Sequence, residues 1–177
     1  MSQKAQELTR FLKRLRAVRE YTPQPVSDDV LGDILDVARW SGSASNRQPT
    51  EIIVVRDAAV RQKIADNGAR AASGAPVALL IVIPDEPERA ELDAFDNGRL
   101  VERILLAAKA HGLGSNIMTL KAEGPKLIAQ DLGVPAGKRL WTVVTIGHID
   151  QAARQARPAN PNAGRKPSDT FVHRERY

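Results

Sequence analysis

Apolar residues recur at helical spacing in five segments of the chain. Because an α-helix turns once every 3.6 residues, side chains three or four positions apart share one face. The pattern predicts amphipathic helices at residues 3–15, at 28–40, after Asp57, at about 91–111 and at 125–132. Ser27 and Asp57 are suited to cap two of these helices, and Gly112 and Gly133 are suited to end two others.

Four shorter apolar segments are typical of β-strands, and they cover residues 51–56, 77–83, 115–119 and 141–149. Residues 77–83 are the most apolar and predict a central strand, since buried strands are rich in β-branched residues. Helices do not alternate regularly with strands, which favours an α+β fold over a doubly wound one. Residues 151–166 lack a core pattern, so we expect one domain over residues 1–177 with an extended C-terminal arm over about 151–177.

The composition is that of a folded protein and excludes several kinds of chemistry. The chain has 177 residues, of which 42% are hydrophobic, and it contains no cysteine. Disulfides, thiolate nucleophiles and cysteine-bound metals are therefore ruled out. The histidines at 111, 148 and 173 are too scattered to predict a metal site. The N-terminal residues lack the apolar centre of a signal peptide, and no segment is long enough to span a membrane, so we expect a cytoplasmic protein.

The net charge of +5 is compatible with binding of a nucleic acid or of an anionic small ligand, and bulk charge alone does not choose between them. Nucleic-acid binding would need clustered cations interleaved with stacking aromatic residues. The arginines are dispersed and only 4% of residues are aromatic, so a phosphate-bearing small molecule is favoured over a nucleic acid. Arginine is well suited to such a ligand because its forked donors match the oxygens of a phosphate.

Four polar motifs are candidates for binding chemistry, and each also has a plain structural explanation. Residues 14–21 place several arginines on the turn that leaves the first helix, where they could also be a solvated patch. Residues 41–49 form a loop of small and amide side chains. Residues 112–115 contain a Gly-x-Gly that follows a helix rather than a strand, which excludes a Rossmann fingerprint. Residues 164–167 carry Arg165 and Lys166 in a segment that could be only a solvated tail.

The order of these motifs resembles the nitroreductase family of FMN oxidoreductases. Along the chain follow Arg16-x-x-Arg19-x-Tyr21, Ser43-x-x-Asn46-x-Gln48-Pro49, Ala75-Pro-Val, Asp96-x-Gly98, Gly112-x-Gly114-Ser115, Gly147 and Arg165-Lys166-Pro167. The resemblance extends from Arg16 to Tyr177. It implies a mostly antiparallel sheet flanked by helices and an intertwined homodimer, in which the C-terminal arm embraces the partner. Each of two FMN sites would be built from both chains.

The resemblance also implies roles for individual residues. Arg16 and Arg19 would lie at the flavin phosphate and at the pyrimidine side of the ring, with Ala17 between them. Arg19 would also stabilise the reduced flavin. The other residues implied are Arg165 and Lys166 at the phosphate, Ser43, Asn46 and Gln48 from the partner chain, Ile117, Met118 and Thr119 along the ring with a backbone N–H near N5, and Asn67 at the pyrimidine edge.

Four positions depart from the family pattern. Leu15 stands where the family often has Arg or His, and Ala17 stands where it often has Ser, so two phosphate contacts are missing. Thr50 replaces a common Trp, and glycine, which is frequent around 119–120, is absent there.

The function expected from the resemblance is electron transfer from NADH or NADPH through FMN to a flat acceptor, such as a nitroaromatic compound or a quinone, by a ping-pong mechanism. The flavin would carry the chemistry, and no protein side chain is expected to be catalytic or to bind a metal. Two alternatives remain open. One is a specialised relative that fragments flavin or removes halogens, and the other is a flavin-binding protein without catalytic activity.

Overall fold

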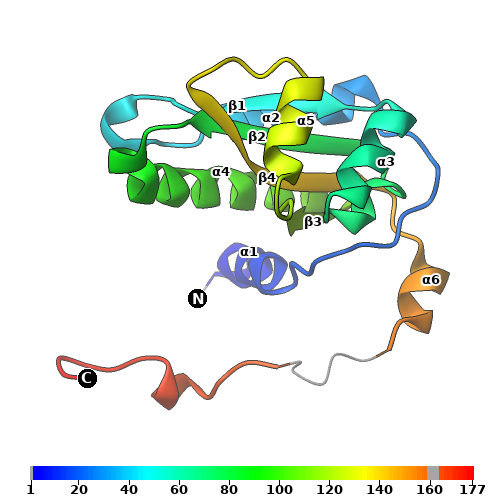
Figure 1. Cartoon of the computed structure of the whole chain (residues 1–177). Helices are drawn as coiled ribbons and strands as arrows, with labels where there is room; N and C mark the ends of the chain where they lie inside the picture. The colour runs from blue at the N-terminus through cyan, green and yellow to red at the C-terminus, as the bar shows by residue number, and fades with distance from the viewer. Residues whose placement is uncertain (1, 159–163) are drawn as a thin grey trace.

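An antiparallel sheet of four strands lies at the centre of the computed structural model, which describes residues 2–158 and 164–177 (Figure 1). The strands are β1 (Glu51–Val55), β2 (Val77–Pro84), β3 (Gly114–Met118) and β4 (Lys138–Gly147). Their order across the sheet is β1-β2-β4-β3, so β1 and β3 form opposite edges. Strand β2 is central and almost wholly buried, as its apolar sequence predicts. The predicted α+β class with an antiparallel sheet is confirmed.

Four helices cover the two faces of the sheet. The described helices are α1 (Gln3–Lys13), α2 (Asp28–Arg39), α3 (Ala58–Asp66), α4 (Ala90–Ala110), α5 (Gly124–Asp131) and α6 (Gln151–Ala156). Helices α2 and α4 pack together on one face, where Ile34, Ile104 and alternate residues of β2 form one buried cluster. Helices α3 and α5 cover the other face, where Ile64 and Ile128 pack against the remaining β2 side chains. Each face of the sheet therefore has its own apolar layer.

The predicted helix ends are confirmed at the atomic level. The side chains of Ser27 and Asp57 accept hydrogen bonds from backbone N–H groups in the first turns of α2 and α3. Gly112 and Gly133 follow α4 and α5 with φ of 72° and 68°, which glycine adopts without strain. The first helix ends at Lys13, two residues earlier than expected, and β4 begins at Lys138, three residues before the predicted Trp141.

The segment expected to start an extended arm is helical at its beginning. Asp150 accepts a hydrogen bond from the N–H of Ala153, and this cap starts the six-residue helix α6 in an alanine-rich stretch. Beyond it, every residue from 164 to 177 is exposed. Apart from the short 3₁₀ turn Ser168–Thr170, this described end of the chain has no regular structure.

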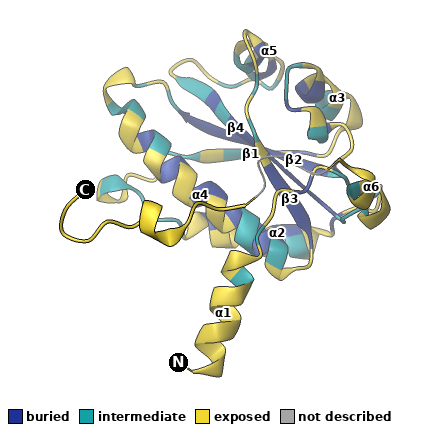
Figure 2. Cartoon of the chain, turned by 90° about the horizontal axis from the view of Figure 1, so that it is seen from below, coloured by how far each residue is buried: buried dark blue, intermediate teal, exposed yellow. Residues whose placement is uncertain are grey.

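Helix α1 stands apart from the sheet and has no buried residue, and Figure 2 shows it projecting from the body of the molecule. Its Leu8 and Leu12 are 56% and 54% exposed and lie one turn apart. Within the part of the chain that the structure describes, no helix is long and apolar enough to cross a membrane.

Candidate active site

The exposed edge of β3 meets the turn that leaves α1. The N–H of Val18 donates a hydrogen bond of 2.9 Å to the carbonyl of Ser115, on the side of β3 that faces away from β4. Because backbone groups of alternate residues point to the same side of a strand, Ile117 also directs its N–H group to this edge, and Thr119 follows directly after the strand. The predicted arginine turn and the predicted ring-contacting strand therefore lie side by side.

Tyr21 fixes the arginine turn to the sheet. Its hydroxyl lies 2.5 Å from the carbonyl of Val18, to which it donates, and 2.8 Å from the hydroxyl of Thr145 on β4. Burial raises the pKa of Tyr21 well above its ordinary value, so the phenol remains a neutral donor. The sequence motif Arg-x-x-Arg-x-Tyr thus has a structural reason, because the tyrosine anchors the segment that carries Arg16 and Arg19.

Glycine lets the turn approach β3 closely. A Cβ at Gly114 would lie 2.6 Å from Cγ1 of Val18 and 2.9 Å from Cγ1 of Ile149. Such distances are far shorter than an ordinary contact of about 3.5–4.0 Å between carbon atoms. The second glycine of the predicted Gly112-Leu-Gly114 motif is therefore a packing requirement at the site.

Two cationic side chains around the turn already donate hydrogen bonds to backbone carbonyls. The guanidinium of Arg16 donates to the carbonyls of Lys13 and Leu15, both at 2.7 Å, and Nζ of Lys109 donates to that of Arg14 at 3.1 Å. These carbonyls lie at the end of α1, where the helix dipole favours cations. Arg16 keeps donors for a further partner, because a guanidinium carries five N–H groups.

A cavity of about 160 Å³ opens between the ends of α1 and α4. Its lining includes Arg14, Arg16, Lys109 and Arg154 and no acidic residue. Sequence reasoning did not single out Lys109 or Arg154, which come from separate helices and meet the turn only in the fold. This donor set fits a phosphate group, since Arg and Lys side chains are the usual phosphate partners in proteins.

Asn67 lies beyond the far end of β3. Its backbone carbonyl accepts a hydrogen bond of 2.8 Å from the N–H of Lys121, two residues after Thr119. Asn67, Arg70 and Lys121 contribute to an open cavity of about 430 Å³. The turn, the exposed edge of β3 and Asn67 thus form a continuous strip, which we call the β3 edge.

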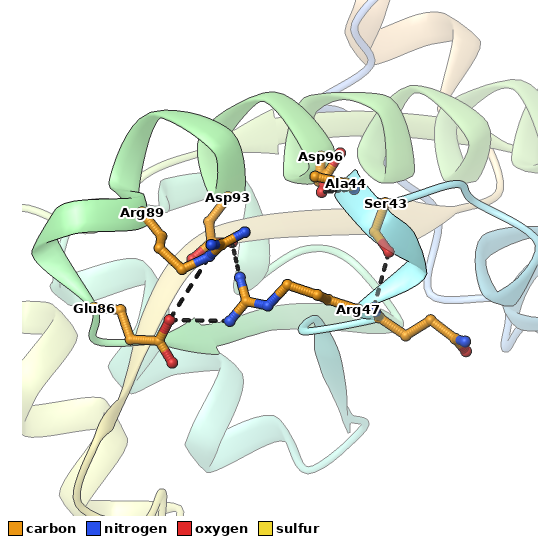
Figure 3. Close-up of polar contacts among 8 residues, drawn as sticks. Ser43, Ala44, Arg47, Glu86, Arg89, Asp93 and Asp96 are labelled. Atoms are coloured by element: carbon orange, nitrogen blue, oxygen red, sulfur yellow. Dashed lines mark hydrogen bonds and ion pairs between the residues drawn. The ribbon is translucent and has the colours of Figure 1, made fainter.

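The residues Ser43, Asn46 and Gln48 lie together in a separate place. Their loop leads into β1, at the sheet edge opposite to β3. The hydroxyl of Ser43 accepts a hydrogen bond of 2.8 Å from the N–H of Gln48, and the amide of Gln48 donates to that of Asn46. The loop rests on α4, where Asp96 accepts a hydrogen bond of 2.7 Å from the N–H of Ala44 (Figure 3).

The structure thus divides the twelve residues named by sequence into three groups. One chain brings seven of them to the β3 edge, namely Arg16, Ala17, Arg19, Asn67, Ile117, Met118 and Thr119. It brings Ser43, Asn46 and Gln48 to the β1 side. Arg165 and Lys166 are exposed, and the contacts described for them join them to neither group. Among the described residues, no cluster of three or more potential metal ligands occurs.

Asp93 and Asn116 escaped sequence reasoning, and Asp96 entered it only as part of the Asp96-x-Gly98 motif, without a role. Asp93 and Asp96 are 2% and 5% exposed on the buried face of α4. Asn116 of β3 is 1% exposed, and its side-chain amide has no hydrogen-bond partner among the described residues. A signal for the two acids was present, because they interrupt the apolar stripe of a helix where charged residues are rarely buried.

The domain thus combines an antiparallel α+β fold with a cationic turn beside an exposed strand edge. The sequence model of the nitroreductase family matches residues 12–73 and 65–148. This chain belongs to the nitroreductase family.

Individual proteins agree with this assignment. The NADH dehydrogenase of Thermus thermophilus is 28% identical in an alignment that spans 79% of this chain and 85% of that protein. The Bacillus subtilis protein named FMN reductase [NAD(P)H] is 24% identical over 193 residues, spanning 97% of this chain and 74% of its own length. The crystal structure of nitroreductase A from Vibrio parahaemolyticus superposes with a TM-score of 0.80 at 25% identity, covering 96% of this chain and 75% of that one.

Proposed function

We propose that this chain acts as a homodimer that binds FMN and transfers electrons from NADH or NADPH to flat acceptors such as nitroaromatic compounds and quinones. Membership of the nitroreductase family supports the activity. The Bacillus subtilis relative, whose name specifies both FMN and NAD(P)H, supports the cofactor and the electron donor.

The observation that carries the proposal is the alignment of the arginine turn with the exposed edge of β3. The bond from Val18 to Ser115 places cationic side chains at one end of a strand whose outward N–H groups follow in a row. A flavin nucleotide has the matching asymmetry, with an anionic phosphate at one end and a flat ring with hydrogen-bond acceptors at the other. The spare donors of Arg16 and the cavity lined by Arg14, Lys109 and Arg154 suit the phosphate end.

Residues further along the β3 edge suit the ring. The side chain of Ile117 is 46% exposed and offers an apolar surface. The N–H of Ile117 would donate to a ring nitrogen, because it faces outward from the strand, and the N–H of Thr119, directly after β3, is the other candidate donor. The side chain of Asn67 would hydrogen-bond to the pyrimidine edge of the flavin. Arg19 would offset the negative charge that the flavin ring gains on reduction.

Bound FMN would supply the redox chemistry, accepting hydride from NAD(P)H and reducing the acceptor in a second half-reaction. The protein's own residues would hold the cofactor, set its orientation and leave one face of the ring open to both substrates in turn. This arrangement predicts ping-pong kinetics. Neither Asp93 nor Asp96 lies on the β3 edge, so no carboxylate pair is assigned to proton transfer.

Three features of the chain support a homodimer. Ser43, Asn46 and Gln48 lie at the wrong sheet edge to join Arg16 within one chain, but a second copy could supply them. Every residue of the segment 164–177 is exposed, including Phe171 at 77%, and the hydrogen bonds described for this segment stay within it. Helix α1 likewise exposes Leu8 and Leu12. Apolar side chains that gather on a surface mark interaction sites.

A flavin titration followed by anaerobic reduction tests the proposal. Added FMN should bind to the purified dimer with quenching of flavin fluorescence, and NADH or NADPH should then bleach the flavin absorbance. Nitroaromatic compounds or quinones should restore the absorbance. A protein that ignores FMN would overturn the proposal. Bleaching without reduction of either acceptor would instead favour a specialised relative, and binding without bleaching would favour a non-catalytic flavoprotein.

Two variants test the assignment of the phosphate. Arg16→Ala and Arg165→Ala should each weaken FMN binding about 10- to 100-fold, because a hydrogen bond to a charged group is worth about 1.5–3 kcal/mol. Lys126→Ala is the matched control, since Lys126 is an exposed cation on α5 that pairs with Glu123. Unchanged FMN affinity in both arginine variants, measured by the same titration, would refute the assignment.

A further inference from the structure

The loop that carries Ser43, Asn46 and Gln48 has a strained backbone. Ser45, Asn46 and Gln48 have φ of 53°, 54° and 51°, and none of them is glycine. Residues with a Cβ adopt this left-handed region only at an energetic cost, because the Cβ comes too close to the carbonyl oxygen. Three such residues within four positions persist only where surrounding contacts determine the loop shape.

The contact that ties this loop to the body comes from α4. The carboxylate of Asp96 accepts a hydrogen bond of 2.7 Å from the N–H of Ala44, directly before the first strained residue. Asp96 is 5% exposed, so water competes little for this bond, and a bond to a charged acceptor is stronger than a neutral one. Figure 3 shows Asp96 reaching from the helix toward Ala44, close to Ser43.

A second anchor lies one turn earlier on the same helix. Arg47 donates to Glu86 at 3.0 Å and lies 3.6 Å from the buried carboxylate of Asp93 (Figure 3). Because residues three apart share a helix face, Asp93 and Asp96 hold both ends of the loop from one side. The guanidinium of Arg47 is therefore paired with acids of the body of the protein and is not displayed together with Asn46.

The anchoring leaves the other side of the loop open. Asn46 and Gln48 are exposed, while the backbone beneath them is fixed by buried acids. Ser43 closes the loop internally through its bond with the N–H of Gln48. A loop with this construction displays two exposed amide side chains in a set conformation, and the bond of 3.3 Å from the amide of Gln48 to that of Asn46 orients one against the other.

We infer that Asp96 is a positioning residue, which holds the strained loop so that Ser43, Asn46 and Gln48 are preorganised for the flavin bound at the β3 edge of the partner chain. This inference rests on the proposed function. Preorganisation raises affinity because the cost of ordering the loop is met on folding rather than on binding. Asp96 acts through Ala44 and does not contact the ligand itself.

The test compares two substitutions at one position. Asp96→Ala removes the acceptor, whereas Asp96→Asn retains an oxygen that can accept the same N–H. We expect Asp96→Ala to weaken FMN binding by the purified dimer at least tenfold and Asp96→Asn to remain within about threefold of the wild type. Asp131→Asn is the control, since Asp131 pairs with the exposed Lys63 far along the chain. Should Asp96→Ala not fold, Asp96→Leu retains the branching at Cγ, leaves no cavity and likewise lacks the acceptor.

Amide hydrogen exchange supplies a readout that stability alone does not move. Exchange in residues 43–48 should accelerate in Asp96→Ala, without FMN and below its unfolding temperature, while β2 stays protected. Wild-type FMN affinity and wild-type exchange in a folded Asp96→Ala variant would overturn the inference and leave the proposed function standing. A wild-type protein that fails to bind FMN would overturn the proposed function, and this inference with it.

Discussion

Replacing Gly114 by alanine should disturb the fold and the flavin site together. The new Cβ would lie 2.6 Å from Cγ1 and 2.8 Å from Cβ of Val18, and 2.9 Å from Cγ1 of Ile149. Val18 is 3% exposed and β-branched, so its side chain has little freedom to rotate away. The strain must therefore separate β3 from the arginine turn and stretch the bond between Val18 and Ser115.

The expected size of the effect follows from this overlap. Overpacking a close-packed site costs about 1–3 kcal/mol. For a chain of this length, each kcal/mol lowers the melting temperature by about 2–4 °C, which predicts a loss of about 2–12 °C for Gly114→Ala. Displacement of the turn should also weaken FMN binding about tenfold, as would the loss of one good hydrogen bond. Thermal unfolding followed by circular dichroism and flavin titration measure the two effects.

Gly32 offers a matched control because it lies within α2 and a Cβ there would meet nothing within 4 Å. Alanine is the better helix former by about 1 kcal/mol, so Gly32→Ala should raise the melting temperature slightly and leave FMN affinity unchanged. A Gly114→Ala variant that melts and binds FMN like the wild type would show that the turn and β3 are not closely packed.

Two further predictions concern the anchoring tyrosine and the dimer. Tyr21→Phe should lower the free energy of unfolding by about 1–3 kcal/mol at neutral pH. Because burial raises the pKa of Tyr21, its contribution to the free energy of unfolding is complete below the ordinary phenol pKa of about 10 and is lost as pH rises further. Urea unfolding from pH 8 to 11 should therefore show the stability of the wild type approaching that of the variant. Parallel plots of stability against pH would contradict this. Leu8→Glu combined with Leu12→Glu should produce monomers in light scattering. Gln3→Glu with Gln6→Glu, which adds the same charges to the opposite helix face, should leave the dimer intact. A dimer unaffected by the first pair would exclude α1 from the interface.

Most of the fold follows from patterns that are local in sequence. The period of apolar residues located α2, α4 and the strand at Val77–Pro84, because burial of one face and β-branched composition both act within a single element. Capping side chains such as Ser27 fixed helix starts for the same reason. Helix α6 escaped prediction because a six-residue helix shows too little periodicity, and only its cap at Asp150 marks it.

The site was less accessible to sequence because its contacts join distant segments. The motif with Arg16 and Arg19 pointed to an anion, but only the fold shows that Arg16 also binds the carbonyls at the end of α1. Nothing local to residue 96 indicates that its carboxylate lies beneath a loop about fifty residues earlier. Such a pairing depends on the packing of α4 against α2, and residue spacing alone does not encode it.

The width of the sheet makes the dimer a condition of the proposed site. Strands β1 and β3 are separated by β2 and β4, and three strand spacings of about 4.8 Å place them about 14 Å apart. Each chain therefore carries two half-sites, the β3 edge and the loop before β1, which one chain does not join. A two-fold axis that places the β3 edge of each chain against the loop before β1 of its partner creates two identical sites at once. FMN affinity should then fall steeply when the protein is diluted below the dissociation constant of the dimer, and an affinity independent of protein concentration across that range would show that one chain suffices.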